Sequence, residues 1–571
     1  MRRSMVLIIA AVCFLSTVWP GNAEAQSRRP RQRRLRRLPV AEYVDKMKGG
    51  WIGQMAGVGW GGPTEFRYRG VIMAADKMPQ WRPELINQFQ QDDIYVEMTF
   101  LRTLELYGMD VSIRQAGIDF ANSGYPLWHA NNAGRSLLRK GVAPPDSGHP
   151  RFNKHADDID YQIEADYAGL IAPGMPNVAI ELGEKFGRLM NYGDGLYGGQ
   201  FVGGMYAEAF FEKDTERIVR AGLRCIPQES QYAECIRDVL DWYKKFPDDW
   251  KKTWEFIEAK YQDDSDYRRF SCNKGDFNID AKINGAYIVM GLLYGKGDPD
   301  QTIIISTRCG QDSDCNPSNS GGVLFTTIGF AALPDRFKSA LNPEGKFSHT
   351  PYNFPKLVSV CEKLVRDSVV RAGGRIEKND VGQEVFVIPA RRPRPSKLEQ
   401  CWEPGPIANS KFTEAEMAQI TALAGKDINS AVEKFAHGWK AAACGFDMDP
   451  GLYAEMNGKK NVLVTHPLDR DTACVLSNKV KVMRADKTLL RLVVGHHPEG
   501  DWTLIVKADD KELLNTTVGK ETAKDGWMEA EVDLSKYGGK EVKLELLNQP
   551  SGWSYEAGYW ARIELVGYDL R

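Results

Sequence analysis

Two short acidic clusters, far apart in the chain, contain the residues best suited to chemistry. The first is Asp92 and Asp93 in QQDDIYVEM, and the second is Asp312 and Asp314 in GQDSDCNPS. If the fold brings them together, four carboxylates share one site, which near neutral pH requires cations to offset their charge. Hard divalent ions such as Mg²⁺, Ca²⁺ and Mn²⁺ prefer oxygen ligands of this kind. The clusters therefore predict an oxygen-ligand metal site, with room for two ions.

Each cluster alone also fits a solvated turn or a helix N-cap, but the flanking sequences favour the metal site. The segment after Asp93, IYVEMTFLRTLELYG, has apolar residues at helical spacing, so the pair should begin an amphipathic helix. The segment after Asp314, NPSNSGGVLFTTIGFAAL, is small and apolar. It predicts a buried helix with acidic residues at its start. Acidic residues at the start of a buried helix are not explained as ordinary solvent-exposed side chains.

The N-terminus predicts export. Residues 1–25 have the charged, apolar and small-residue regions of a signal peptide, with Ala23-Glu24-Ala25 as the cleavage site. We therefore expect a secreted or periplasmic protein with no membrane span in the mature chain. Residues 26–39, which contain SRRPRQRRLRRLP, fit either an arm for anionic partners or a solvated linker. The formal net charge of −2 shows no basic bias elsewhere, which favours a linker and argues against nucleic acid as a partner.

The remaining chain has two patterns of periodicity. Residues 40–386 have apolar residues at three- and four-residue spacing and predict an all-α domain. Residues 387–450 look like a connector, with ARRPRPSK as a hinge and a helix capped by Ser410 or Thr413. Residues 451–571 contain short alternating runs such as NVLVTHP, LLRLVVGHH and WTLIVKADD, which predict a β-sandwich accessory domain of the jelly-roll or galactose-binding-like type.

Two further expectations concern this second part and the cysteines. Its aromatic residues either form a sugar-stacking surface or pack the sandwich, and packing is the commoner outcome; they are Trp502, Trp527, Trp553, Tyr555 and Tyr559. An exported chain permits disulfides, for which Cys225 with Cys235 and, more weakly, Cys401 with Cys444 are the candidate pairs.

With three motifs in view, residues 40–340 resemble the ADP-ribosylglycohydrolase family. The motifs are GGWIGQMAGVGWGGPTEF ending in Glu65, then Gln91-Asp92-Asp93-Ile94, and then Gly310-Gln311-Asp312-Ser313-Asp314-Cys315. Their order and spacing match the family's Gly-rich helix, its Thr-Asp-Asp-Thr-like motif and its Gly-x-Asp-Thr-Asp-Thr motif. The resemblance implies an all-helical, metal-dependent hydrolase that cleaves a glycosidic bond to a ribose-like sugar.

The resemblance also implies roles for particular residues. The metal ligands of two Mg²⁺ or Mn²⁺ ions would be Gln91, Asp92, Asp93, Asp312, Asp314 and Cys315. The catalytic residues would be Glu65, beside the ribose, with Asp93 and Asp312. Three positions depart from the family pattern, since Gln91 and Cys315 replace threonines and Val58 replaces an aspartate. A thiol is a soft ligand that suits Mg²⁺ poorly, so these changes indicate a divergent subgroup.

Two middle segments could complete the pocket. HADDIDYQIEADYAGL contains Asp157, Asp158 and the candidate substrate-binding residues Asp160, Glu164 and Asp166, which otherwise form a solvated helix face. NYGDGLYGGQFVGG adds Asp194, Tyr192 and Tyr197, which either approach a ligand or form a tight turn between helices. His129 is either a general acid or a buried, satisfied histidine.

Three functions remain open. The first is the family's hydrolysis of ADP-ribose from an ADP-ribosylated macromolecule or another small-molecule or glycan substrate. The second is a secreted glycoside hydrolase acting on a furanosyl or other extracellular glycan, which export and an accessory sandwich would suit. The third is a catalytically inactive sugar- or nucleotide-binding protein on the same fold, which the departures at Val58, Gln91 and Cys315 would suit.

Overall fold

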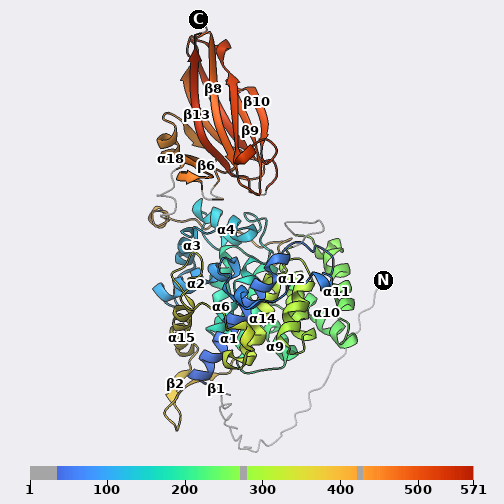
Figure 1. Cartoon of the computed structure of the whole chain (residues 1–571). Helices are drawn as coiled ribbons and strands as arrows, with labels where there is room; N and C mark the ends of the chain where they lie inside the picture. The colour runs from blue at the N-terminus through green and yellow to red at the C-terminus, as the bar shows by residue number, and fades with distance from the viewer. Residues whose placement is uncertain are drawn as a thin grey trace, which may run out of the picture.

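A computed structural model of the chain describes residues 35–270, 279–420, 428–445, 448, 450–553 and 555–569, and it has a helical part and a β part (Figure 1). The predicted signal peptide and residues 26–34 of the predicted linker lie outside the described residues. Within the described ranges, no helix has both the length and the apolar character needed to cross a membrane.

The helical part confirms the all-α prediction. Its helices are α1 (Val40–Gly61), α2 (Asp92–Tyr107), α3 (Ile113–Ala121), α4 (His129–Arg139), α5 (Asp160–Ile163), α6 (Asp166–Leu170), α7 (Pro176–Phe186), α8 (Asp194–Ala209), α9 (Thr215–Leu223), α10 (Gln231–Lys245), α11 (Trp250–Ile257), α12 (Ala281–Tyr294), α13 (Pro299–Arg308), α14 (Cys315–Ile328) and α15 (Phe354–Arg371). Helices α1, α8, α12 and α14 are buried along most of their lengths, which explains why they are apolar on every face.

Helices α1 and α14 lie in close backbone contact at the centre of this part. Gly53, Gly57 and Gly61, spaced four residues apart, form one side of α1 and face α14 and the turn before it. A Cβ atom at Gly57 would collide with the carbonyl group of Pro317, and one at Gly61 with the carbonyl oxygen of Ser313. The glycines therefore let α1 approach closely enough to fix the position of the second acidic cluster.

A small antiparallel sheet closes one end of the helical part. Its strand order is β1 (Leu35–Pro39), β3 (Glu384–Pro389) and β2 (Arg375–Lys378). Strand β1 comes from the segment that we expected to be linker, and β3 crosses the expected domain boundary at residue 386. Arg36 of β1 forms an ion pair of 2.8 Å with Glu208, which fastens the basic segment to α8.

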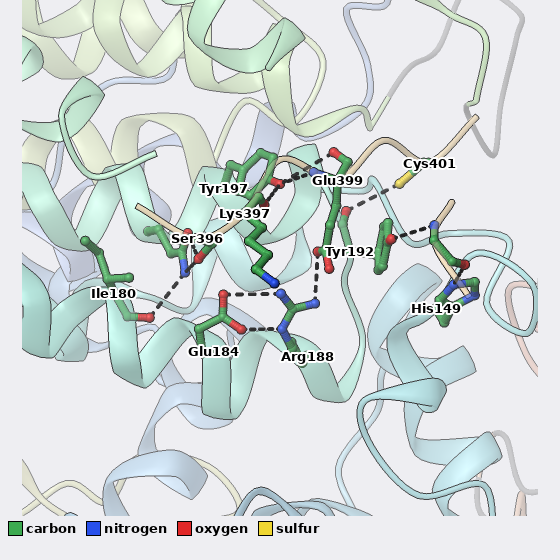
Figure 2. Close-up of polar contacts among 12 residues, drawn as sticks. His149, Ile180, Glu184, Arg188, Tyr192, Tyr197, Ser396, Lys397, Glu399 and Cys401 are labelled. Atoms are coloured by element: carbon green, nitrogen blue, oxygen red, sulfur yellow. Dashed lines mark hydrogen bonds and ion pairs between the residues drawn. The ribbon is translucent and has the colours of Figure 1, made fainter. Parts of the chain in front are cut away.

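The connector is bound along the helical part and does not form the expected hinge (Figure 2). The Tyr197 hydroxyl donates to the Lys397 carbonyl at 2.7 Å and accepts from the Glu399 N–H at 2.6 Å. Arg188 forms an ion pair of 3.0 Å with Glu399, and the Tyr192 hydroxyl accepts from the Gly405 N–H at 3.0 Å. Helix α16 (Glu414–Met417) follows, with Thr413 as its N-cap in a capping box. The helix ends at Met417, earlier than expected, and residues 421–426 of the expected helix lie outside the described residues.

The C-terminal part confirms the β-sandwich prediction. One five-stranded sheet has the order β10 (Lys511–Val518), β9 (Trp502–Ala508), β12 (Glu541–Gln549), β7 (Cys474–Lys481) and β4 (Lys440–Ala442). The other has the order β11 (Trp527–Asp533), β8 (Lys487–His496), β13 (Gly558–Tyr568), β6 (Lys459–Thr465) and β5 (Gly451–Met456). Helix α18 (Ile428–Phe435) packs against the sandwich core.

Most of the candidate stacking aromatics pack the sandwich. Trp502 is fully buried, Tyr559 is buried, and Trp527 is partly buried against a small apolar cluster. Tyr555 alone among the five is exposed, at 37 %.

Neither candidate disulfide forms. The cysteines of the described ranges are free thiols, and Cys401 donates to the Tyr192 carbonyl in the helical part, whereas Cys444 belongs to the sandwich. The thiol of Cys444 instead lies against that of Cys474, the first residue of the neighbouring strand β7.

Candidate metal centre

The two acidic clusters meet at the starts of α2 and α14, as the sequence predicts. Asp92 and Asp93 are the first residues of α2, and Asp314 is the residue before α14. Asp92, Asp93 and Cys315 each offer one ligand atom within 4.8 Å of the others, and so do Asp312, Asp314 and Cys315. Cys315 therefore joins both groups. We call the four aspartates the carboxylate centre.

The carboxylate centre contains no cation of its own among the described residues. None of the ion pairs between described side chains involves its aspartates. Burial, together with the charge of Asp314, raises the pKa of Asp92 to about 6. Burial and the neighbouring aspartates raise the pKa of Asp93 and of Asp312 well above the usual range. The arrangement is electrostatically strained unless protons or a cation neutralise it.

Buried oxygens without a partner show what kind of cation would fit. Oδ1 of Asp93 and Oδ1 of Asp312 are buried, and neither has a hydrogen-bond partner among the described residues. Unsatisfied, charged oxygens at this density suit a hard divalent ion such as Mg²⁺ or Mn²⁺. Burial and the aspartates raise the pKa of the Cys315 thiol, which donates to Asp93 Oδ2 at 3.2 Å. As a neutral thiol, Cys315 is a weaker candidate ligand than the aspartates.

Glu65 lies at the exposed rim of the carboxylate centre. The Thr64 hydroxyl is 2.8 Å from the Ser313 hydroxyl, and the Phe66 N–H donates to the Gln311 carbonyl at 3.1 Å. These contacts hold the segment around Glu65 against the second cluster. The negative charge of Asp314, then burial and Asp92, raise the pKa of Glu65 to about 9. Gln91, the other predicted ligand at this edge, is the half-buried N-cap residue of α2.

Two further buried acids, Asp166 and Glu97, lie next to the carboxylate centre and are held by hydrogen bonds. Asp166, at the start of α6, accepts from Asn319 at 2.8 Å, and its charge contributes to the raised pKa of Asp93. Glu97 accepts from Gln54 and from the Tyr167 N–H. Glu97 was not among the residues predicted from the sequence, although it lies one helical turn after Asp93 and so shares its face of α2. The amide of Asn319, which follows the second cluster on α14, was not predicted either.

Asp160 and Glu164 also adjoin the centre. Asp160 accepts from the Asn131 N–H at 3.0 Å, at the start of α4, while Glu164 accepts from the Asn131 side-chain amide. The charge of Asp92 contributes to the raised pKa of both carboxyls, although burial is the larger cause. The alternative of a solvated helix face is wrong, since both side chains are buried.

Asp194 and Tyr197 do not join this site. The ring of Tyr197 is fully buried and its hydroxyl holds the connector, so the expectation that it stacks on a sugar is wrong. Asp194 accepts from the Tyr232 N–H at 3.2 Å and lies near Lys282. It belongs to a second buried acidic group, in which Asp157, Asp194 and Asp280 surround Lys282, and which we call the Lys282 group.

Comparison with known proteins identifies the family of the chain. The family model for ADP-ribosylglycohydrolase matches residues 39–371. The chain belongs to this family. A solved ADP-ribosylglycohydrolase-related protein complex is 14 % identical, with a TM-score of 0.36, and the match covers 57 % of this chain and 99 % of the other. No curated protein gives a significant match.

Two solved structures are similar to part of the chain. One is a CBM35 from Paenibacillus barcinonensis, at 10 % identity and a TM-score of 0.18, covering 23 % of this chain and 94 % of the other. The other is a cyclase from Fischerella sp. TAU, at 15 % identity and a TM-score of 0.17, covering 22 % and 72 %.

Proposed function

We propose that the chain is a divalent-cation-dependent hydrolase of a glycosidic bond to a ribose-like sugar. Membership of the ADP-ribosylglycohydrolase family supports a glycohydrolase activity. The observation that carries the finer proposal is the convergence of Asp92, Asp93, Asp312 and Asp314, from two distant segments, without a cation among the described residues. We propose Mg²⁺ or Mn²⁺ as the ion, with room for two.

The aspartates would hold the cation, and Glu65 would act as the general base that accepts a proton. A cation bound by the centre would offset the carboxylate charge, orient sugar hydroxyls and acidify a water molecule. Asp314 is the largest cause of the raised pKa of Glu65. Neutralising Asp314 would lower that pKa, so the Glu65 carboxylate could then accept a proton from the attacking water.

The supporting acids would position the sugar. Asp160 and Glu164 lie beside Asp92 and are fixed by Asn131, so their remaining oxygens can accept hydrogen bonds from hydroxyls. Cleavage of a glycosidic bond passes through an oxocarbenium-like state, which a nearby negative charge stabilises. Rigid placement on α2, α5 and α14 would hold the reacting groups in one geometry.

The substrate is proposed in two classes. The first is ADP-ribose attached to a macromolecule, and the second is a furanosyl or other extracellular glycan. The second class gains support from the predicted signal peptide, which also leads us to propose a secreted or periplasmic location. The net charge of −2 gives the chain no overall basic bias, which argues against nucleic acid as a partner.

The test is an activity assay with metal control. Purified mature protein is incubated with an ADP-ribosylated peptide and a panel of furanosyl and pyranosyl glycosides, in Mg²⁺, Mn²⁺ or EDTA. We expect turnover of at least one substrate, which EDTA and Asp312→Asn abolish. The control Asp76→Asn, an exposed aspartate of the same part, should leave turnover unchanged.

Two outcomes would contradict the proposal. Turnover that survives both EDTA and Asp312→Asn would show that the centre does not bind a catalytic cation. Tight sugar binding without turnover of any substrate would assign the chain to the binding proteins on this fold.

A further inference from the structure

The second acidic cluster lies in a turn whose backbone conformation is unfavourable on its own. Gly310 and Gln311, which precede Asp312, both have left-handed backbone conformations, with φ angles of 85° and 58°. Glutamine rarely adopts this conformation, because its Cβ atom crowds the following carbonyl oxygen. Asp92 and Asp93, by contrast, are residues of α2 itself, so the helix fixes their backbone. The position of Asp312 therefore depends on contacts from other segments.

One side of this turn is held by the chain between α1 and α2. The Gln311 N–H donates to the Tyr68 carbonyl at 2.8 Å, and the Gln311 carbonyl accepts from the Phe66 N–H at 3.1 Å. A Cβ atom at Gly310 would lie 2.4 Å from the Tyr68 carbonyl oxygen, so only glycine permits this close approach. These contacts fix the backbone at Gln311, one residue before the cluster.

A further contact comes from the side chain of Asn284 on α12. Its Oδ1 accepts from the Asn316 side-chain amide at 2.8 Å and, more weakly, from the Asp312 N–H at 3.4 Å. Its Nδ2 donates to the Asp280 carbonyl, one helical turn earlier, at 3.1 Å. All four residues are buried. Asn284 thereby joins α12 both to the turn and to the start of α14.

The orientation of the Asn284 amide is fixed by backbone groups. The Asp312 N–H can only donate a hydrogen bond, and the Asp280 carbonyl can only accept one. A rotated amide would place its NH₂ group against the Asp312 N–H and its oxygen against the Asp280 carbonyl. The amide therefore has one favourable orientation, in which its oxygen faces the second cluster.

We propose that Asn284 is a positioning residue of the carboxylate centre. By accepting from the Asp312 N–H and from Asn316, it sets the position from which the Asp312 carboxylate binds a cation. Replacing a residue that orients a metal ligand through hydrogen bonds typically weakens metal binding by about 10- to 100-fold. The inference rests on the proposed function, since it assumes that the centre binds Mg²⁺ or Mn²⁺.

The test measures Mn²⁺ affinity by calorimetry with the full mature chain. In Asn284→Ser, the hydroxyl can still donate to the carbonyl four residues earlier, at Asp280, but it is too short to reach the turn or α14. We expect Asn284→Ser to weaken Mn²⁺ binding about tenfold. Asn284→Asp keeps an acceptor oxygen for Asn316 and should stay within about threefold of wild type.

A second readout reports the geometry of the centre. The electron paramagnetic resonance spectrum of bound Mn²⁺ should broaden in Asn284→Ser, because the ligands are less uniformly placed, and should keep its wild-type shape in Asn284→Asp. If Asn284→Ser does not fold, Asn316→Ala removes the stronger of the two contacts and should weaken Mn²⁺ binding several-fold. Wild-type affinity in Asn284→Ser, or in Asn316→Ala when that variant replaces it, overturns the inference.

Asn153→Ser is the matched control. Asn153 is also a buried asparagine of the helical part, and its amide donates to the carbonyls of Ala130 and Met190 at 3.1 Å and 2.9 Å. Asn153→Ser should lower the melting temperature about as much as Asn284→Ser but should keep the Mn²⁺ affinity of wild type. An equal loss of affinity in both variants would assign the effect to general loosening of the fold and overturn the inference.

The same measurements separate this inference from the proposed function. Wild-type Mn²⁺ affinity in Asn284→Ser, together with turnover that requires the metal, overturns the role of Asn284 and keeps the metal-dependent hydrolase. A tenfold loss of affinity in Asn284→Ser, together with turnover that ignores EDTA, does the opposite. Absence of Mn²⁺ binding by wild type overturns both.

Discussion

The chain buries two groups of acidic side chains, and they differ in how their charge is compensated. In the Lys282 group, the Lys282 ammonium pairs with Asp280 and lies near Asp157 and Asp194, and these acids raise its pKa further. In the carboxylate centre, no described lysine or arginine pairs with the four aspartates. A buried acidic group that contains a lysine has its negative charge neutralised within the fold. A buried acidic group without a basic side chain needs a bound cation to neutralise its charge. This difference identifies which group is structural and which is a site.

The largest expected effect concerns the Lys282 group. Lys282→Met leaves buried carboxylates without their cation, and should lower the free energy of unfolding by about 3–5 kcal/mol. Urea denaturation in EDTA and in Mg²⁺ measures it, and the loss should be the same in both. Lys252→Met, at an exposed ion pair, should cost less than about 1 kcal/mol.

A double variant keeps the prediction testable if Lys282→Met does not fold. Adding Asp280→Asn to Lys282→Met should recover part of the stability, because it removes one uncompensated charge. A loss that disappears in Mg²⁺ would instead show that the Lys282 group binds cations, and would remove the contrast between the two groups.

The next effect is the stabilisation of the carboxylate centre by metal. A cation that binds only the folded chain should raise the free energy of unfolding by about 2.7 kcal/mol at a concentration one hundred times its dissociation constant. Thermal unfolding with and without Mg²⁺ or Mn²⁺ measures it. Asp93→Asn should abolish the increase, whereas Asp194→Asn in the Lys282 group should keep it. Equal increases in both variants would contradict this assignment.

The pH dependence without metal should follow from the raised pKa values. The pKa of Asp92 is raised to about 6 and that of Glu65 to about 9, so the folded chain binds more protons than the unfolded chain. Stability in EDTA should therefore fall as the pH rises from about 4 to about 9, by on the order of 1–3 kcal/mol. Saturating Mg²⁺ should weaken or reverse this trend, and Asp92→Asn should reduce it. A stability that rises with pH throughout this range in EDTA would contradict it.

The smallest effect concerns Cys315. Cys315→Thr replaces a neutral thiol with a hydroxyl oxygen, the donor that hard ions prefer, and should tighten Mg²⁺ binding by a few-fold, about 1 kcal/mol. Calorimetric titration measures the affinity for Mg²⁺. The variant Cys315→Ala, which removes the thiol without adding a hydroxyl, separates the effect of the new oxygen ligand from the effect of losing the thiol. Weaker binding in Cys315→Thr than in Cys315→Ala would show that the thiol does not occupy a ligand position.

Much of the helical part and of the site could be predicted from local patterns. The positions of Asp92, Asp93, Asp312 and Asp314 before helical runs were enough to predict that each pair begins a helix. That the two pairs share one site followed from the resemblance of the ordered motifs to the family. Six strands of the sandwich, including β6, β8 and β9, were predicted because each alternates apolar and polar residues. The edge strand β10 was missed because KELLNTTV has polar residues on both faces.

What the sequence could not reveal depends on contacts between distant segments. The basic composition of LRRLP predicts a solvated linker, and only pairing with β3 makes it a strand. The Gly-rich loop at Tyr197 has the composition of a ligand loop, but the connector covers it. The acids of the Lys282 group and those of the centre are alike in composition, and only the fold shows that one group contains a lysine.

The most direct test of the central claim is equilibrium binding of Mn²⁺ to the chain, followed by electron paramagnetic resonance of the free ion. We predict saturable binding of at least one Mn²⁺ per wild-type chain, which the double variant Asp92→Asn, Asp312→Asn loses and Asp194→Asn retains. Equal Mn²⁺ binding by wild type and the double variant, or none by either, would contradict it.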